Sequence, residues 1–372
     1  MPIYTMWLFG LFSFMCVFQV LTYLLLFRKS TCNKTTVPGM AVPVSVVIAA
    51  RNESENLRLL IPALLNQKYP DFEIVVIDDR SEDDSYEIIR EYMHKSDKII
   101  CVRIDAESSE LRGKKNALTA GIIRAKNNLL LFIDADCLPV TDMWISCMVS
   151  GLKPECEIVL GYSGFYSDKS FLNEVIRYDT VFIGMQYSSF ACAGLPYMGV
   201  GRNLLYTKSL WQMNNGFTSH ADLISGDDDL FVQQVANRVN TAVRIQADAT
   251  TRSKAAQSFI GWCRQKSRHF STAGRYPITV GLFLVSEPVT RILYWLSFLT
   301  LLFTLPDILK ILLISMWIFR EMVTIKITCS FCKITGEPCS WVKIPFYNLI
   351  LPFIYIFLWA FNKSQKGNYH WK

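Results

Sequence analysis

Hydrophobic residues are unevenly distributed along the chain, and their spacing predicts three regions. Residues 3–27 carry no charge and can span a bilayer as one helix. Residues from about 40 to 250 alternate short β-branched runs with helical patterns. After about residue 278 the chain turns apolar again, with candidate spans near residues 292–306, 308–327 and 344–361. We therefore expect a globular domain with membrane segments on both sides.

The middle region reads as strands separated by helices. The runs VSVVIAA, EIVVIDD, KIICVRI and LLLFIDADC have strand length, and helical patterns such as ENLRLLIPALLNQ and GKKNALTAGIIRAK lie between them. This alternation with short connections predicts an α/β fold with a mostly parallel, doubly wound sheet. In such sheets ligands bind beyond the carboxyl ends of the strands.

Acidic side chains follow two of these strands. Asp78 and Asp79 end the second strand, and Asp134 and Asp136 follow the run LLLFI. Acidic residues often cap turns after strands, which is the structural alternative. The functional interpretation is a divalent cation, because Mg²⁺ and Mn²⁺ bind one or two protein carboxylates together with substrate phosphates. A nucleotide diphosphate would complete such a site.

A further charged group lies on each side of this acidic pair in the sequence. Lys114 opens a predicted helix, whose N-terminus favours phosphate, or it is a solvated lysine. The segment SGDDDLF contributes Asp227 and Asp228, either as caps of the helix that follows or as a general base for an acceptor hydroxyl. The sequence leaves both alternatives open.

Composition narrows the class of protein. The net charge is +6, hydrophobic residues make up 51% and charged residues 19%, which is too apolar for an ordinary soluble enzyme. Basic residues gather beside the apolar segments, as in WCRQKSRHFSTAGR, and this suits anionic headgroups better than nucleic acid. The eleven cysteines show no disulfide framework, which indicates a reducing cytoplasm. CSFCKITGEPC resembles part of a zinc site but lacks a fourth ligand.

These motifs, in this order, resemble the processive-type family 2 glycosyltransferases. The likeness rests on VSVVIAARNESENL, EIVVIDDRSEDDS, GKKNAL, DAD, GDDDL and QKSRH, and it extends from about Val44 to His269. It implies a GT-A nucleotide-sugar fold flanked by transmembrane helices, as in ceramide glucosyltransferase-like and polysaccharide synthase members. It also implies a nucleotide-sugar donor, such as a UDP-sugar, a lipid or glycan acceptor, and Mg²⁺ or Mn²⁺ as cofactor.

The resemblance further implies roles for individual residues. Arg51 and Glu53 would line the nucleotide pocket, and Asp79 would contact the base or ribose. Lys114 would approach the diphosphate, and Asp136 would coordinate the metal with Asp134 beside it.

The acceptor side of the site is implied by the later motifs. The acidic cluster would supply the base, for which Asp227 is preferred over Asp228. Gln265 and Arg268 match the family's Q-x-x-R-W motif, but His269 replaces its tryptophan, which weakens the case for a polymer synthase. Gly201, Arg202 and Asn203 would border the sugar.

The predicted organisation is a transmembrane helix at 1–28, a cytoplasmic catalytic domain at 40–254, an interfacial amphipathic helix at 255–277, and a membrane region at 278–372 with two to three hydrophobic segments. Lys and Arg after the first helix place the N-terminus outside and the domain in the cytoplasm of a multi-pass cell-membrane protein. Prolines 345 and 352 suggest that the last segment is re-entrant, with a basic, cytoplasmic C-terminal tail. The leading function is a membrane glycosyltransferase. A processive polysaccharide synthase, or a transport or scaffold protein with a non-catalytic nucleotide-sugar domain, is the alternative.

Overall fold

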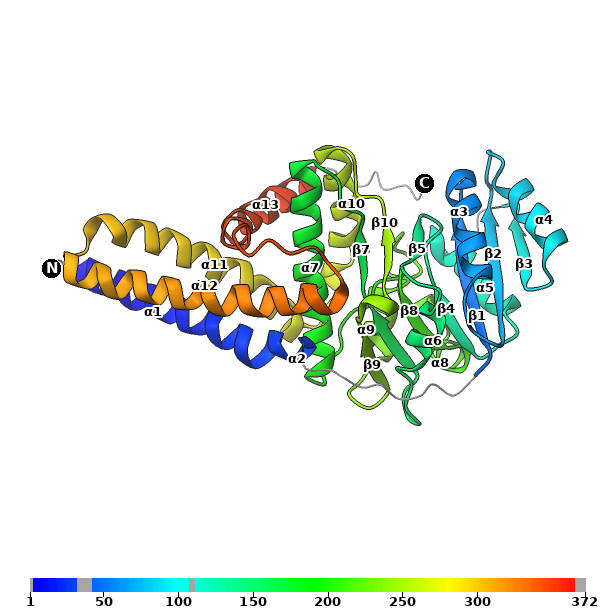
Figure 1. The fold of residues 1–372 in the computed structure, drawn as a ribbon, viewed down its shortest axis with the longest axis horizontal. Coiled ribbons are helices and arrows are strands. Elements are labelled where there is room, and N and C mark those ends of the chain that lie inside the picture. The colour runs from blue at the N-terminus through cyan, green and yellow to red at the C-terminus, as the bar shows by residue number, and fades with distance from the viewer. Residues whose placement is uncertain (1–2, 32–41, 107–110, 365–372) are drawn as a thin grey trace.

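The fold has an α/β domain at one end and a helical bundle at the other (Figure 1). The computed structural model describes residues 3–31, 42–106 and 111–364. The strands are β1 Val44–Ala50, β2 Phe72–Asp79, β3 Ile99–Ile104, β4 Leu129–Phe132, β5 Cys137–Pro139, β6 Ile158–Gly161, β7 Ser163–Phe165, β8 Leu204–Thr207, β9 Thr241–Arg244 and β10 Thr251–Ser253.

Helices of very different length connect these strands. The short and medium helices are α2 Arg28–Thr31, α3 Ser54–Leu65, α4 Ser85–Lys95, α5 Lys114–Arg124, α6 Trp144–Val149, α8 Lys208–Met213, α9 Asp229–Val235 and α10 Phe259–Phe270. The long helices are α1 Ile3–Leu21, α7 Phe171–Cys192, α11 Ile278–Thr304, α12 Asp307–Thr335 and α13 Ile344–Ser364. A π-helical turn, η1 Thr22–Phe27, joins α1 to α2, and short 3₁₀ turns are η2 Thr218–His220, η3 Ala247–Ala249 and η4 Ala273–Arg275.

Seven strands form one sheet in the order β3-β2-β1-β4-β8-β6-β9, and β5-β10-β7 form a small second sheet. In the large sheet β1 pairs in parallel with β2 and β4, β2 with β3, and β6 with β9. Strand β8 runs antiparallel to its neighbours β4 and β6. The predicted mostly parallel α/β sheet is therefore confirmed. Because β2, β1 and β4 are neighbours, their carboxyl ends meet at one edge.

Both faces of the sheet are covered, which explains the continuous apolar runs of its central strands. Val47 and Ile77 share a buried cluster with Ile122 of α5. Val46, one position earlier in β1, points the other way and shares a second cluster with Leu57 of α3. Every residue of β1 and β2 is buried as a result.

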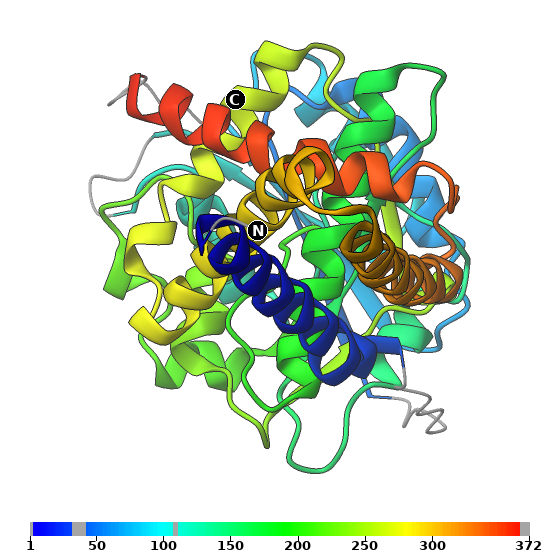
Figure 2. The same cartoon turned by 90° about the vertical axis from the view of Figure 1, so that its left-hand side faces the viewer.

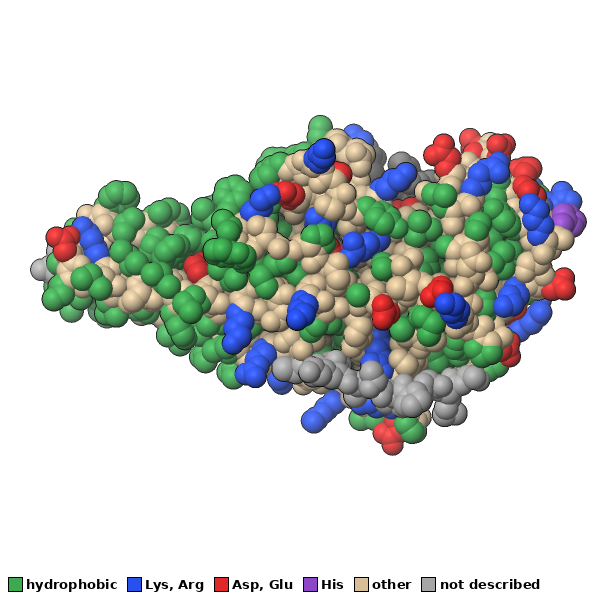
Figure 3. Space-filling view, viewed as in Figure 1, with side chains coloured by type: hydrophobic (Ala, Val, Ile, Leu, Met, Phe, Trp, Pro, Cys, Tyr) green, Lys and Arg blue, Asp and Glu red, His purple; other side chains and the backbone are tan. Residues whose placement is uncertain are grey.

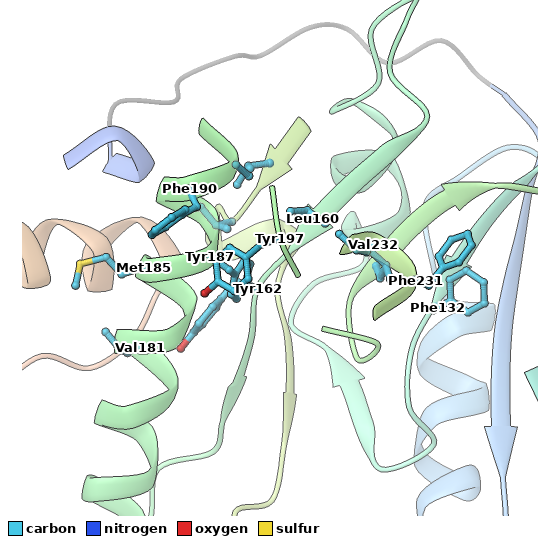
Figure 4. Close-up of a cluster of buried hydrophobic side chains, with 14 of the residues drawn as sticks. Phe132, Leu160, Tyr162, Val181, Met185, Tyr187, Phe190, Tyr197, Phe231 and Val232 are labelled. Carbon is cyan, nitrogen blue, oxygen red and sulfur yellow. The ribbon is translucent and has the colours of Figure 1, made fainter. Parts of the chain in front are cut away.

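Helix α7 stands between the sheet and the bundle, and aromatic side chains fill the space around it (Figure 4). The Tyr187 hydroxyl donates to the Gly161 carbonyl at 2.6 Å and so fixes α7 against β6. Tyr162, which follows β6, packs edge-on against Phe331 of α12, with ring centroids 5.6 Å apart. One core therefore joins the α/β domain to the bundle.

Helices α1, α11 and α12 lie side by side and project away from the domain (Figure 1). Phe12 stacks on Tyr294 at 5.1 Å and Phe298 on Trp317 at 5.7 Å, which joins all three helices. Hydrophobic side chains cover most of this projection in the view of Figure 3. Three segments are long and apolar enough to cross a membrane: Ile3–Thr31, Ile278–Thr304 and Ile344–Lys363.

Two structural features of α12 and α13 bear on this assignment of candidate spans, which rests on length and composition alone. Helix α13 crosses the projecting bundle instead of running along it (Figure 2). Helix α12 runs within the bundle but carries Arg320 at its middle, where the fully buried guanidinium donates to Gln19 Oε1 of α1 at 2.9 and 2.5 Å and pairs with Glu321. Helix α13, one of the three apolar segments, therefore lies across the other two, whereas α12, which is not among them, lies along them (Figure 2).

Candidate active site

Two loops at the sheet edge are joined by hydrogen bonds. After β1, the Asn52 N–H donates to Ser81 Oγ at 3.0 Å, and the Glu82 N–H donates back to Asn52 Oδ1 at 2.8 Å. The Glu53 N–H donates to Ser85 Oγ at 2.9 Å. Ser54 N–H donates to Asp83 Oδ2 at 3.1 Å. Ser81, Asp83 and Ser85 thus hold the loop after β1 against the loop after β2.

Of the predicted nucleotide-side residues, Arg51 and Glu53 belong to the first of these loops and Asp79 ends β2. The fully buried Asp79 accepts from Arg80 Nε at 2.8 Å and Nη2 at 3.3 Å. The buried Nε of Arg51 has no hydrogen-bond partner among the described residues. That leaves a donor available to a ligand beside this wall.

The neighbouring Asp78 is also fully buried, with the guanidinium of Arg103 at 3.9 Å from Oδ2. Burial raises the pKa of Asp78 above its usual value. Asp78 and Asp79 are thus both enclosed where β2 ends.

Lys114 connects the two acidic clusters of the sequence. Its ammonium pairs with Asp134 after β4 and lies 3.7 Å from Asp227 Oδ2. Burial lowers the pKa of Lys114, but Asp134 and Asp227 more than offset this, so that the net shift is upward. Burial likewise raises the pKa of Asp134, and Lys114 reverses the shift to a net decrease. Both groups are ionised at neutral pH.

The backbone before Lys114 depends on Gly113. This residue has φ +64° and ψ −142°, a conformation that side chains of L-residues rarely adopt. A Cβ there would lie 2.7 Å from the Ile224 carbonyl oxygen. The loop that leads to the second acidic cluster therefore packs directly on the start of α5.

Lys115 fixes that loop from inside. Its fully buried ammonium donates to the carbonyls of His220 at 2.6 Å, Leu223, and Ser225 at 3.3 Å. Sequence reasoning singled out Lys114 and missed Lys115, because the acceptors lie more than a hundred residues away and belong to a loop without a motif.

The three consecutive aspartates have different partners. Asp228 accepts from the Gly201 and Asp229 N–H groups, both at 2.7 Å, and is the N-cap of α9. Asp229 is buried and accepts from Thr272 Oγ1 at 2.5 Å and Tyr276 OH at 2.9 Å. Asp227 faces Lys114 and lines a small cavity with Lys114, Gly201, Tyr206 and apolar side chains.

Burial raises the pKa of Asp227 to about 6; Lys114 opposes the shift, and Asp228 adds to it. Burial also raises the pKa of Asp228 to about 6, and the charge of Asp229 adds to that shift. The site therefore holds two carboxylates that titrate close to neutral pH, as a general base requires.

The segment predicted as one helix over residues 255–277 is divided. Helix α10 covers Phe259–Phe270 and begins where Ser258 Oγ accepts the Gly261 N–H at 3.1 Å. It ends before Thr272 because that side chain is bound to Asp229. Trp262 and Cys263 of α10 are buried, whereas Phe259 is 41% exposed.

Gln265 and Arg268 of α10 are half-buried. Burial and Lys114 have the largest effects on the pKa of Asp134, and the positive charges of Arg202 and Arg268 lower it further. His269, which stands where the motif has tryptophan, is exposed on α10.

The expectation for Asn203 is wrong. Its fully buried side chain donates to the carbonyls of Tyr162 and Ala249, both at 2.7 Å, and accepts from Trp144 Nε1 at 3.0 Å. With its amide saturated inside the core, Asn203 cannot border a sugar. Arg202 donates to Ser253 Oγ at 3.3 Å and lies over the Phe165 ring at 4.7 Å.

The acidic residues can supply only part of the ligand set of a divalent cation. Asp136 is exposed and Asp134 half-buried, in the short connection from β4 to β5. In the part of the chain that the structure describes, no three His, Cys, Asp or Glu side chains form a metal-holding group, and this includes the cysteines of CSFCKITGEPC. Two hard carboxylates suit Mg²⁺ or Mn²⁺ shared with a diphosphate, and the donor set agrees with that chemistry.

Comparison with known proteins agrees with the fold and motifs. Residues 45–201 match the family model Glycosyl transferase family 2. The chain is 29% identical over 133 residues, 35% of this chain and 48% of the relative, to the UDP-Glc:alpha-D-GlcNAc-diphosphoundecaprenol beta-1,3-glucosyltransferase WfaP of Escherichia coli. It is 30% identical over 171 residues, 45% of this chain and 40% of the relative, to the poly-beta-1,6-N-acetyl-D-glucosamine synthase of Staphylococcus epidermidis. The matches span about half or less of these relatives.

A solved structure extends the likeness of the fold. Mannosyltransferase PcManGT from Pyrobaculum calidifontis, in complex with GDP-Man and Mn²⁺, superposes with a TM-score of 0.56 at 15% sequence identity, covering 89% of this chain and 100% of that chain. This confirms the predicted GT-A type of α/β fold. Residues 45–201 therefore match the family 2 glycosyltransferases in sequence, within a fold of GT-A type.

Proposed function

We propose that this chain is a membrane glycosyltransferase that transfers one sugar from a nucleotide-sugar donor to a lipid or glycan acceptor. The observation that carries the proposal is the convergence of Lys114, Asp134 and Asp227 at the sheet edge. A lysine between two carboxylates can bind a diphosphate, and the carboxylate on its far side can accept a proton.

The donor side is assigned to the sheet edge. Arg51, Glu53 and Asp79 line the nucleotide pocket. In support of this, all three lie where the neighbouring strands β1 and β2 end and their loops are joined by hydrogen bonds. Lys114 binds the diphosphate. Asp136, with Asp134, holds Mg²⁺ or Mn²⁺, which when bound neutralises charge that develops on the leaving diphosphate.

The acceptor side is assigned to the second acidic cluster and α10. Asp227 takes the proton of the acceptor hydroxyl, so that the oxygen attacks the anomeric carbon as the bond to the diphosphate breaks. A single displacement of this kind inverts the configuration at that carbon. Asp228 holds its two backbone N–H partners, which favours Asp227 as the base. Gln265 and Arg268 face the donor diphosphate from α10.

The membrane arrangement follows from the bundle. We propose that α1, α11 and α12 span the cell membrane and that α13 lies across them at the cytoplasmic surface, supported by its crosswise direction (Figure 2). Arg28 and Lys29 directly after η1 then lie in the cytoplasm with the catalytic domain. Three spans leave both the domain and the C-terminus on the cytoplasmic side. The basic tail beyond residue 364 lies outside the described residues.

The experiment is a transfer assay with purified full-length protein in detergent. Donors are UDP-glucose, UDP-N-acetylglucosamine and GDP-mannose, and acceptors include a polyprenyl diphosphate-linked sugar, as the names of the relatives suggest. A single added sugar, detected by mass spectrometry, supports the proposal. Long products support a polysaccharide synthase instead, and neither donor binding nor transfer with any pair supports a non-catalytic scaffold.

Metal removal tests the cofactor. Chelation with EDTA should abolish transfer, and Mn²⁺ or Mg²⁺ should restore it, because Asp134 and Asp136 repel a diphosphate without a cation between them. Asp136→Ala should lower the rate by about two orders of magnitude or more at unchanged thermal stability. Full activity in EDTA would contradict metal assistance.

A further inference from the structure

Asp179 is a buried carboxylate in the middle of α7 that belongs to none of the family motifs. It is 1% exposed. Its Oδ2 pairs with the Lys266 ammonium, and its Oδ1 accepts from the Tyr355 hydroxyl at 2.6 Å. Lys266 lies on α10 and Tyr355 on α13, so that one side chain joins three helices.

Helix α10 packs into the core through the buried side chains of Trp262 and Cys263, and polar contacts add to this packing. Lys266 lies between Gln265 and Arg268 in sequence, and its ammonium sits 5.9 Å from the Trp262 ring centroid. Beyond that, Phe259 contacts Phe357 of α13 at 5.5 Å between ring centroids. The far end of the segment is tied to Asp229 through Thr272 and Tyr276. Asp179 therefore supplies the buried polar tie in the central part of α10.

A buried ion pair has a strong effect on geometry even where its net stability is small, because either charge alone in that place is costly. The Asp179–Lys266 pair permits few alternative positions of α10. The Tyr355 hydroxyl donates to the other oxygen of the Asp179 carboxylate, and this hydrogen bond extends the constraint to α13.

We propose that Asp179 is a positioning residue that fixes α10, and with it Gln265 and Arg268, in register with the α13 helix at the membrane surface. This inference rests on the proposed function and deepens it. Helix α10, which carries Gln265 and Arg268, takes its position from α13, whose exposed side chains include Phe353, Phe357 and Trp359. The position of the membrane helix thereby sets the affinity of the site for its donor.

The chain offers a matched control on the same helix. Glu174, one and a half turns earlier on α7, likewise accepts from a lysine and a tyrosine: Lys343 at 2.6 and 2.8 Å and Tyr347 at 2.5 Å. Lys343 directly precedes α13 and Tyr347 lies in it, and the hydrogen bonds of both run to Glu174 of α7. Glu174→Gln therefore removes a comparable charge from α7 without touching the connection to α10.

The first experiment measures hydrogen exchange of residues 259–270 in full-length, detergent-purified protein without ligand. Asp179→Asn should speed exchange over this segment by about tenfold, and Tyr355→Phe, a milder change, by about threefold. Glu174→Gln should match the wild type there. Wild-type exchange in Asp179→Asn, or an equal increase in Glu174→Gln, would overturn the proposal.

The second experiment measures transfer kinetics. In Asp179→Asn the donor KM should rise about tenfold with a smaller fall in kcat, whereas loss of folded protein would lower the apparent kcat alone. Lys266→Met should behave similarly, and the double variant should be no worse than either single change, because the two residues act as one unit.

Failure of the two proposals can be told apart. If the wild-type protein transfers no sugar, the proposed function fails, and the exchange experiment still tests the coupling of α10 to α13. If the wild type is active and Asp179→Asn keeps the donor KM of Glu174→Gln, the positioning role fails while the proposed function stands.

Discussion

At the scale of single residues, Asp227, Asp228 and Asp229 are consecutive aspartates whose carboxylates have different partners. Asp229 accepts hydrogen bonds from side-chain hydroxyls of the segment after α10, and Asp228 accepts hydrogen bonds from backbone N–H groups. Asp227 alone faces Lys114 and the small cavity. These partners are the reason that we propose Asp227 as the base.

Isosteric amides should separate these roles. Asp227→Asn should lower kcat by on the order of 10³ while donor binding is retained, because the amide keeps the shape but cannot take a proton. Asp228→Asn keeps an oxygen for the Gly201 N–H and should retain appreciable rate. Turnover and nucleotide binding by calorimetry check both changes. The reverse pattern would transfer the role of base to Asp228.

The pKa shifts predict the pH dependence. Burial raises the pKa of Asp227 to about 6, and a base works only when it is deprotonated. The rate should therefore fall about tenfold per unit as the pH drops below 6, and level off above about 7. Since Asp228 titrates in the same range, the midpoint belongs to the pair. A kcat/KM profile that is flat between about pH 5 and 7 would exclude a carboxylate base with this pKa.

At the scale of elements, the start of α5 depends on one backbone conformation. Gly113→Ala should lower the free energy of unfolding by about 2 kcal/mol, because the new Cβ meets the Ile224 carbonyl at a positive φ. It should also lower kcat/KM, since Lys114 follows directly. Thermal unfolding in detergent measures the first effect. Gly281→Ala on α11 is the control: a Cβ there has nothing within 4 Å, and stability should be unchanged or slightly higher.

Much of the element order could be predicted, because buried parallel strands are continuous apolar runs and their helices show one apolar face. The antiparallel β8 could not, since LLYT has no pattern that encodes direction. Lys115 and Asn203 were also out of reach, because their partners are backbone carbonyls distant in sequence. The early end of α10 has the same cause: a hydroxyl–carboxylate bond from residue 272 to residue 229 overrides local helix preference.

At the scale of the whole molecule, three spans predict the side on which each end lies. A protease added to intact cells should remove a tag at the N-terminus and spare one at the C-terminus. Disruption of the membrane should expose both tags, which shows that the C-terminal tag is cleavable. Cleavage of the C-terminal tag in intact cells would mean that α13 spans, against its crosswise direction.

The buried contact between Arg320 and Gln19 has a consequence for biosynthesis. An arginine near the middle of a spanning helix costs about 2.5–3.5 kcal/mol on insertion scales, so α12 enters the lipid poorly alone. Its acceptor lies on α1, which leaves the ribosome some three hundred residues earlier. The first helix must then remain in the bilayer, with the Gln19 amide available to Arg320, while the whole catalytic domain is translated. Under the proposed three-span arrangement, removal of α1 should therefore leave α12 outside the lipid.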